Sequence, residues 1–266
     1  MAKRRTKRRN LENTVATIQK QYGPKALYRG GEPAIMRQWP HVPTGFDALD
    51  GITGCSGIPL GATTIVSGRT TSGKLTLAFK TLACAQQRSR NEQVVILDLT
   101  RQSDPDYLAR CGVDLDRLLI ARPALGPGVV DLLVDLLRSR QLRFVLVDSL
   151  VELMADGPTA RRLNAALGLI DHAVREAGSA LLFIDDPAPP WNRWALTGWL
   201  MNRNWPVIQR SSLHIECRRE RWLRQAGDLV GYQAQARILR SRWAHGQPAA
   251  LIESRFNGTV QAHSTW

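Results

Sequence analysis

The stretch Gly68-Arg-Thr-Thr-Ser-Gly-Lys74-Leu75 decides the fold of this 266-residue chain. It matches the phosphate-binding loop pattern G-x-x-x-x-G-K-[ST] at every fixed position except the last. The two glycines permit a turn in which successive N–H groups face phosphate oxygens, and Lys74 supplies a positive charge for the β- and γ-phosphates. The last position normally carries a hydroxyl that ligates Mg²⁺, and here it is Leu75. The stretch therefore predicts a nucleotide site whose metal half is incomplete.

The residues around the loop are those that a phosphate-binding loop needs. The run Ala62-Thr-Thr-Ile-Val-Ser67 before it is short and β-branched, as expected for a buried strand. After Lys74, apolar residues recur at helical spacing as far as Ala85, which predicts a helix. The alternative is a chance glycine-rich turn, and the order of strand, loop and helix argues against it.

A second motif lies about 70 residues beyond the loop. Phe144-Val-Leu-Val-Asp148 has four apolar residues and ends in a carboxylate, which is the form of a Walker B strand whose Asp holds Mg²⁺. Buried strands often end in Asp, so this motif gains its weight from the loop that precedes it.

Apolar strands alternate with helices through the middle of the chain, which predicts an α/β fold with a mostly parallel central sheet flanked by helices. The further segments expected there are strands at 94–98, 118–121 and 180–184 and helices at 129–137 and 159–177, the last of which is capped by Gly178. After residue 206 polar and apolar residues alternate, which predicts an antiparallel extension of one sheet edge. Its strands are expected at 212–217, 234–240 and 248–254.

The positive charge of the chain lies at its two ends. Residues 1–25 hold eight Lys or Arg and one Glu, net +7, and residues 201–266 hold ten Arg and four acidic residues, net +6. These sums equal the total of +13, so the middle of the chain is neutral. Charge placed in this way suits a polyanion such as DNA or RNA, while a basic tail kept for solubility is the alternative for the start of the chain.

Composition excludes several kinds of protein. No run of eighteen apolar residues is present, so we expect no membrane partner, and the basic start lacks the apolar segment of a secretory signal. The cysteines have no C-x-x-C spacing, so neither a zinc site nor a disulfide framework is expected; they are Cys55, Cys84, Cys111 and Cys217. A cytoplasmic, nucleoid-associated protein fits these observations.

From about Leu11 to Val260 the chain resembles the core of the bacterial RecA recombinase. The matching stretches, in order, are Ile18-Gln-Lys-Gln-Tyr-Gly23, Pro43-Thr-Gly-Phe-Asp-Ala-Leu-Asp50, Gly57-Ile-Pro-Leu-Gly61, the phosphate loop, Asp104-Pro-Asp-Tyr107, Cys111-Gly-Val-Asp-Leu-Asp-Arg-Leu-Leu119, Val145-Leu-Val-Asp-Ser149 and Asp228-Leu-Val-Gly231. The resemblance implies a RecA-like P-loop NTPase core at 34–261, and the large C-terminal domain of RecA has no counterpart in the sequence. The flanking segments are then a disordered basic tail at 1–10, an oligomerisation-type helix and linker at 11–33, with the helix at 11–21, and a short tail at 262–266.

One stretch is similar to a narrower group within that family. Gly112-Val-Asp-Leu-Asp-Arg-Leu-Leu-Ile-Ala-Arg-Pro123, together with the altered positions described below, resembles ImuA. That protein is the RecA-like accessory subunit of a mutagenic translesion polymerase complex.

The resemblance implies ATP as a ligand, with Mg²⁺ left uncertain by the missing loop hydroxyl. Asp148 then faces the metal, while Asp104 and Tyr107 match positions that contact adenine. The remaining nucleotide-binding positions are Gly68, Arg69, Thr70, Thr71, Ser72, Gly73, Lys74, Leu75 and Thr76.

Two positions that serve hydrolysis in RecA are altered here. The glutamate that activates the attacking water is replaced by Thr100, which cannot accept a proton at neutral pH. The glutamine that senses the γ-phosphate lies in a pair that reads Asp185-Asp186 here. Two carboxylates facing a triphosphate would repel it. The alternatives are that they face solvent or bind a metal in an altered way.

Two further segments are implied to face partners. Arg240 and Arg242 match lysines that reach the neighbouring subunit's ATP in a RecA filament; two solvated arginines on an edge strand are the alternative. The segment 187–206 matches a DNA-binding loop. Its candidate contacts are Trp191, Arg193, Trp194, Trp199, Arg203 and Trp205. Tryptophan beside arginine suits base stacking, a protein interface or a flap packed on the core.

The expectation is therefore a RecA-like protein of DNA repair and the SOS damage response. It would bind single-stranded DNA or a RecA–DNA filament, support error-prone translesion synthesis with its polymerase complex, and hydrolyse ATP weakly or not at all. An active ATPase of homologous recombination, dependent on single-stranded DNA, and a pure protein-interaction module are the alternatives. A homo-oligomer built through the first helix is a further expectation, with a helix folded on its own core as its alternative.

Overall fold

The computed structural model describes residues 2–23, 39–88, 92–186 and 205–256. The chain divides into two units, Met1–Gln38 and Trp39–Trp266. The expected boundary of the core was residue 34, and the observed division lies at residue 39.

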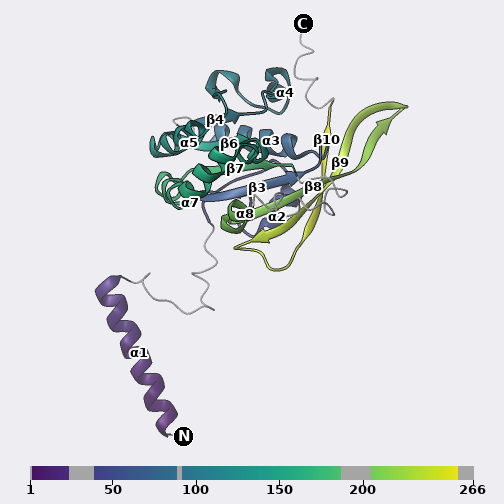
Figure 1. The fold of residues 1–266 in the computed structure, drawn as a ribbon. Coiled ribbons are helices and arrows are strands. Elements are labelled where there is room, and N and C mark those ends of the chain that lie inside the picture. The colour runs from purple at the N-terminus through teal and green to yellow at the C-terminus, as the bar shows by residue number, and fades with distance from the viewer. Residues whose placement is uncertain (1, 24–38, 89–91, 187–204, 257–266) are drawn as a thin grey trace, which may run out of the picture. The chain divides into compact units, whose positions relative to one another are not determined.

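The described part of the first unit is one helix, α1 (Ala2–Tyr22) (Figure 1). It begins nine residues before the helix expected at Leu11, so the prediction of a disordered tail over residues 1–10 differs from the structure. Alanine, lysine and arginine all favour the helix, and no glycine or proline interrupts the segment. Gly23, whose φ is 93°, directly follows the end of the helix, one residue later than the end expected at residue 21.

The second unit is built on an eight-stranded sheet with the order β10-β9-β8-β3-β7-β6-β4-β5 (Figure 1). The strands from β8 to β5 run parallel, and β9 and β10 are antiparallel to their neighbours. Their bounds are β3 (Ala62–Gly68), β4 (Gln93–Asp98), β5 (Leu118–Ala121), β6 (Leu142–Asp148), β7 (Ala180–Asp185), β8 (Leu213–Gln225), β9 (Asp228–Ser241) and β10 (Ala249–Arg255). The predicted fold class, mostly parallel with an antiparallel end, is confirmed.

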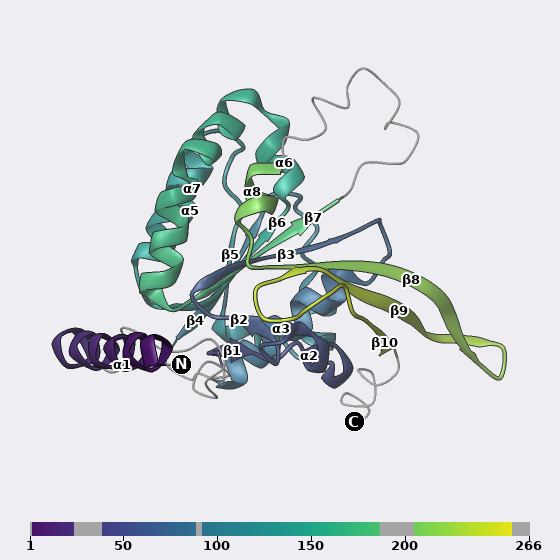
Figure 2. The ribbon, with the colours of Figure 1, turned by 90° about the horizontal axis from the view of Figure 1, so that it is seen from below.

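Helices cover both faces of this sheet, and Figure 2 shows α5 and α7 on one side and α2 and α3 on the other. The helix bounds are α2 (Asp47–Thr53), α3 (Lys74–Arg88), α4 (Pro105–Arg110), α5 (Gly128–Arg138), α6 (Leu150–Ala155), α7 (Gly157–Ala177) and α8 (Trp205–Arg210). A 3₁₀ turn η2 (Leu115–Arg117) precedes β5, and a small sheet pairs β1 (His41–Val42) with β2 (Ile58–Pro59). Gly178 caps α7 in the left-handed conformation, as expected.

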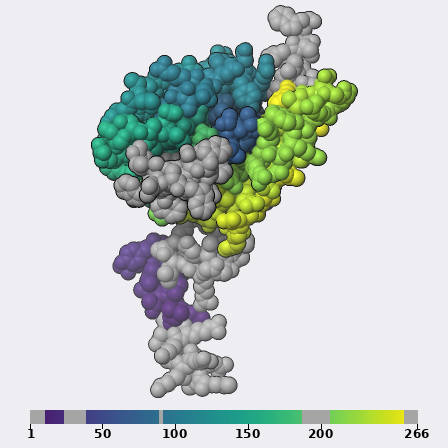
Figure 3. Space-filling model, turned by 45° about the vertical axis from the view of Figure 1, so that its right-hand side comes forward, coloured from purple at the N-terminus to yellow at the C-terminus, as the bar shows by residue number. Residues whose placement is uncertain are grey.

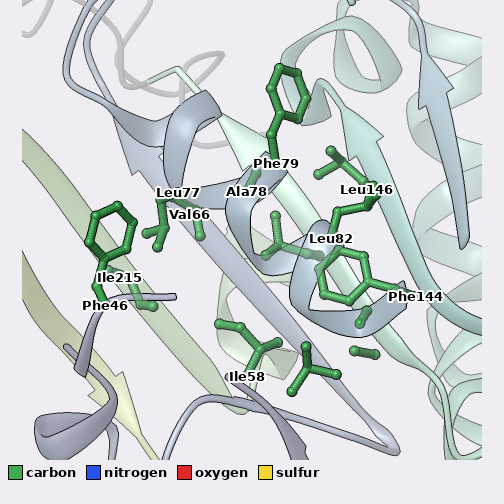
Figure 4. Close-up of a cluster of buried hydrophobic side chains, with 14 of the residues drawn as sticks. Phe46, Ile58, Val66, Leu77, Ala78, Phe79, Leu82, Phe144, Leu146 and Ile215 are labelled. Carbon is green, nitrogen blue, oxygen red and sulfur yellow. The ribbon is translucent and has the colours of Figure 1, made fainter. Parts of the chain in front are cut away.

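Successive residues of each central strand point into two separate cores, because side chains alternate across a sheet. Val66 and Phe144 belong to the core beneath α3, which Figure 4 shows, whereas Ile65 and Val145 belong to the core beneath α5 and α7. All four side chains are fully buried. This double coverage explains why the central strands read as continuous apolar runs.

The C-terminal strands differ from the expectation in two respects. β8 pairs with β3 in parallel, so the antiparallel region begins one strand later than expected. β8 and β9 are also much longer than the predicted segments, and Figures 1 and 2 show their hairpin projecting from the sheet. Their two-residue turn, Ala226-Gly227, has positive φ at both positions, 50° and 93°, which matches the twist of a tight hairpin.

Two findings concern the classes excluded by composition. Within the described ranges, no helix has the length and apolar character needed to cross a membrane. The four cysteines are free thiols.

Candidate functional site

The phosphate-binding loop joins the carboxyl end of β3 to the start of α3, in the order expected from the sequence. Thr71 and Gly73 have φ values of 64° and 93°, so two left-handed residues turn the chain between strand and helix. Ser72 N donates to Arg69 O at 3.0 Å, which closes the turn. The first N–H groups of α3 have no acceptor within the helix, and together with the helix dipole they favour an anion at this end.

A cavity of about 540 Å³ opens above this loop. Its size suits a nucleotide-sized ligand. The walls come from the carboxyl ends of β3, β4, β6 and β7 and from the C-terminal strands; the lining residues are Thr70, Thr71, Ser72, Gly73, Lys74, Leu75, Thr76, Thr100, Gln102, Tyr107, Asp148, Ser149, Val151, Glu152, Asp186, Trp222, Tyr232 and Phe256. Ligands of open α/β sheets bind at this edge.

Lys74 is held by two oxygen atoms of the chain. Its Nζ donates to Gly68 O at 2.9 Å and forms an ion pair in direct contact with the carboxylate of Asp186. The Lys74 side chain is 8% exposed and that of Asp186 is 44% exposed. Asp186 follows the end of β7, the strand beside β3, which brings its carboxylate to the loop. The carboxylate of Asp186 therefore contacts the phosphate site, while part of it remains exposed to solvent.

The hydroxyl of Thr76, on the first turn of α3, lies between two tyrosine hydroxyls. Tyr107 on α4 and Tyr232 on β9 each approach Thr76 Oγ1 to 2.5 Å. Burial raises the pKa of both tyrosines, so both phenols are neutral near pH 7 and can donate hydrogen bonds. Thr76 Oγ1 is thus occupied by partners within the protein.

Aromatic side chains of the C-terminal strands form one wall of the cavity. Trp222 and Phe256 lie 6.2 and 6.1 Å from Tyr232, centroid to centroid. The guanidinium of Arg219 stacks on Trp222 at 4.2 Å, a cation–π contact. A β-carbon added at Gly73 would lie 2.8 Å from Tyr232, so the ring requires glycine at this loop position. Figure 3 shows the strands that carry this wall, in light green and yellow, on the surface of the second unit.

The opposite wall carries the Walker B residue. Thr100 Oγ1 donates to Asp148 Oδ2 at 3.0 Å, so the residue at the position of the expected base is bound to the expected metal ligand. Burial raises the pKa of Asp148, and the nearby Asp98 adds to that effect. Asp98 itself is fully buried and pairs with Arg122 at 2.8 Å. The carboxylate that β6 brings to this side of the cavity, Asp148, is therefore already engaged by Thr100.

The cavity fits a nucleotide better than it fits a magnesium ion. Ser72 Oγ is buried without a hydrogen-bond partner, and the helix start offers N–H groups to phosphate. At the metal position, Asp148 is bonded to Thr100, and Leu75 brings no oxygen ligand. Among the described residues, no group of three or more His, Cys, Asp or Glu side chains could hold a metal ion. The residues present therefore do not form a complete Mg²⁺ site.

Other predicted site residues lie elsewhere. Asp104 caps α4 by accepting from Asp106 N at 3.0 Å and does not line the cavity. Arg240 donates to Ile208 O at 3.2 Å and to Gln209 O, at the C-terminal end of α8. Arg242 is exposed. Gly68 and Arg69 support the loop without lining the cavity.

The predicted DNA contacts cannot be compared with the structure. Trp191, Arg193, Trp194, Trp199 and Arg203 lie outside the described residues. Trp205 begins α8, and its side chain is likewise outside the description.

Sequence reasoning missed several residues of the cavity wall. Glu152 on α6, for which the sequence carries no motif, lines the cavity. Trp222, Tyr232 and Phe256 were missed because the turn Ala226-Gly227 lacks the Asn-Gly or Asp-Gly signal that would have set the hairpin register. In that register Trp222 and Tyr232 are directly opposite each other.

These features define the class of P-loop nucleotide-binding proteins. A buried strand leads into a glycine loop with a lysine, a helix follows the loop, and another strand of the same sheet ends in an acidic residue. Comparison with known sequences specifies the family. The RecA N-terminal domain matches residues 9–185, which is more than half of the chain, so this chain belongs to the RecA family.

Curated relatives extend the likeness beyond that domain. A mitochondrial DNA repair protein recA homolog of Dictyostelium discoideum is 26% identical over 269 residues, which cover 94% of this chain and 58% of that protein. Protein RecA of Aquifex aeolicus is 28% identical over 250 residues, covering 90% of this chain and 72% of that protein. Protein RecA of Amycolatopsis mediterranei is 29% identical over 251 residues, covering 88% and 70%. The chain thus spans between about half and three quarters of the length of these relatives.

Proposed function

We propose that this chain is a RecA-family accessory protein of DNA repair and damage tolerance, of the ImuA-like kind, that binds nucleotide but hydrolyses it weakly or not at all. The observation that carries this proposal is the contact of Thr100 with Asp148 on the cavity wall. The γ-phosphate side of the site then has a neutral hydroxyl where hydrolysis needs a base.

In this proposal the chain holds ATP without activating water. The N–H groups at the start of α3 and Lys74 bind the phosphates, and Tyr107 contributes to the wall around the base. When bound, ATP supplies the triphosphate whose terminal bond is the one open to hydrolysis. Thr100 keeps its proton at neutral pH, and Leu75 places a hydrocarbon where a metal ligand is expected, so the residues present bind and orient far better than they transfer protons.

DNA is the partner proposed for the basic surfaces. The second half of β8 carries arginines that neutralise phosphates, namely Arg218, Arg219, Arg221 and Arg224. Single-stranded DNA, alone or in a RecA–DNA filament, is the polyanion that the resemblance to RecA implies. The tryptophans of segment 187–204 supply the proposed stacking contacts. A translesion polymerase complex is the partner that this chain is proposed to recruit to the DNA.

The remaining proposals concern assembly. Arg240 is an exposed residue near the end of β9 and Arg242, also exposed, directly follows that strand, so both suit contact with a neighbouring subunit's nucleotide. Helix α1 belongs to the first unit, Met1–Gln38, and carries an exposed Leu11, which suits docking on another subunit in a homo-oligomer or on RecA.

The test is ATP turnover with and without single-stranded DNA. The native chain and Lys74→Ala are both expected to show no turnover that DNA stimulates. DNA binding should persist in Lys74→Ala. The double variant Leu75→Thr with Thr100→Glu restores the expected metal-binding hydroxyl and the expected general base, and should raise turnover by about a hundredfold, the lower range for a positioned general base. Robust turnover by the native chain that is lost in Lys74→Ala would overturn the proposal.

An active ATPase of homologous recombination is the second candidate, and Glu152 is the observation that favours it. This half-buried carboxylate lines the same cavity as Lys74 and Asp148. It is the one glutamate among the described residues that could orient a water there. If this candidate holds, Glu152→Gln abolishes DNA-stimulated turnover while nucleotide binding persists.

A further inference from the structure

The ion pair of Lys74 with Asp186 lies at the point where a phosphate-binding loop meets the terminal phosphates. A P-loop lysine is placed to contact the β- and γ-phosphates. Here its ammonium group is already in contact with a carboxylate and with Gly68 O, and its side chain is almost completely buried. The carboxylate of Asp186 therefore stands where an oxygen of a ligand's phosphate would bind Lys74.

The two halves of the phosphate site differ in how far they are occupied. The N–H groups at the start of α3 need no side chain and remain available to one phosphate group. The lysine half is neutralised by Asp186, and among the described residues the other carboxylates that line the cavity are those of Asp148 and Glu152. A second phosphate group placed beside Lys74 would be repelled by these carboxylates, because the charge of Lys74 is already neutralised by Asp186.

We propose that Asp186 determines which nucleotide this site takes, and that it selects a nucleoside diphosphate over the triphosphate. The carboxylate acts as an internal substitute for the γ-phosphate. A diphosphate can use the loop and the helix start while the ion pair stays closed, whereas a triphosphate must open the ion pair and bring its additional charge against Asp186. This inference rests on the nucleotide binding of the proposed function and adds a preference that the family motif alone does not contain.

The geometry also explains the position of Asp186. It directly follows β7, which pairs with β3 along its whole length, so the residue after the strand lies level with the start of the loop. Ser67 pairs with Asp185 in that register, and Gly68 is the next residue along β3. An aspartate is long enough from this position to reach Lys74, and the observed ion pair records that contact.

The experiment is calorimetric titration of the full chain with ADP and with ATP, each in EDTA and in Mg²⁺. The native chain is expected to bind ADP more tightly than ATP. Asp186→Asn keeps the size of the side chain and removes its charge, and is expected to strengthen ATP binding relative to ADP by about tenfold, which corresponds to about 1.4 kcal/mol. Because Asp186 is nearly half exposed, this variant should fold, and its thermal midpoint is measured alongside.

Glu152→Gln is the matched control. It removes one negative charge from the same cavity at a residue that is not a recorded partner of Lys74. A general charge effect would move the ADP-to-ATP ratio equally in both variants, whereas the proposal requires the larger change in Asp186→Asn. Lys74→Ala in the Asp186→Asn background should abolish the gain, which assigns the binding to the loop.

Two outcomes overturn the inference and are distinguishable. If both nucleotides bind and the ratio is the same in the native chain, Asp186→Asn and Glu152→Gln, Asp186 has no selective role and the proposed nucleotide binding stands. If neither nucleotide binds any of these proteins, the nucleotide site of the proposed function fails as well.

Discussion

Protonation of His214 links the stability of the sheet beneath the phosphate loop to pH. His214 is a buried residue of β8, and its Nε2 lies 2.8 Å from Oγ of Ser67, the residue before Gly68. Burial lowers the pKa of His214 to about 4, and the charge of Arg240 contributes in the same direction. A depressed folded-state pKa means that the unfolded chain binds the proton more readily, so stability is fully present above the ordinary pKa of 6.5 and is lost as pH falls toward 4.

The size of the effect follows from that shift. Between about pH 7.5 and about pH 5, His214 accounts for a loss of about 2 kcal/mol in the free energy of unfolding, since each pKa unit is worth about 1.4 kcal/mol. The assay is urea unfolding of the native chain and of His214→Gln at both pH values. Other histidines and carboxylates contribute equally to both proteins, so the difference between the two pH dependences isolates His214. If the two proteins lose the same stability, the buried neutral imidazole does not exist and the reasoning is wrong.

Two further predictions concern the C-terminal strands. Tyr232→Phe removes the hydroxyl that donates to Thr76 at 2.5 Å but keeps the ring, so urea unfolding should show a loss of about 1 kcal/mol; an unchanged value would contradict the bond. Gly231→Ala adds a β-carbon 2.2 Å from Ser254 O on β10, and unfolding should become easier by about 1–3 kcal/mol. The control for it, Gly168→Ala, adds a methyl group to α7 where nothing lies within 4 Å, and should stabilise by up to about 1 kcal/mol.

The central sheet could be predicted because its signals are local. β3 is a short β-branched stretch that is buried along its whole length, and β6 carries the apolar run Phe144–Val147, as expected for strands covered on both faces. The loop between β3 and α3 could be predicted for the same reason, since its two glycines and its lysine are adjacent in the chain. Helix α7 ended where the sequence placed a glycine that can adopt positive φ.

The long hairpin could not be predicted, because its signal is not local. Beyond Cys217, β8 continues through Arg218, Arg219, Glu220 and Arg221, a charged run with no alternation to mark a strand. Pairing with β9 across the hairpin satisfies this backbone, and the pairing depends on the turn rather than on the residues of β8 themselves. The turn residue Ala226 adopts positive φ, for which alanine gives no warning.

The chemistry of the site depends on contacts between residues that are far apart in the sequence, and a local motif does not include such contacts. Lys74 identifies the loop, but its partner Asp186 follows a different strand, 112 residues further along the chain. Thr76 belongs to the same motif, and its two tyrosine partners come from α4 and β9. A motif establishes which groups are present, whereas the charge available to a ligand depends on which partners already use those groups. For this chain the loop alone predicts a triphosphate site, and the ion pair of Lys74 with Asp186 favours a diphosphate, which is why the two nucleotides must be measured separately.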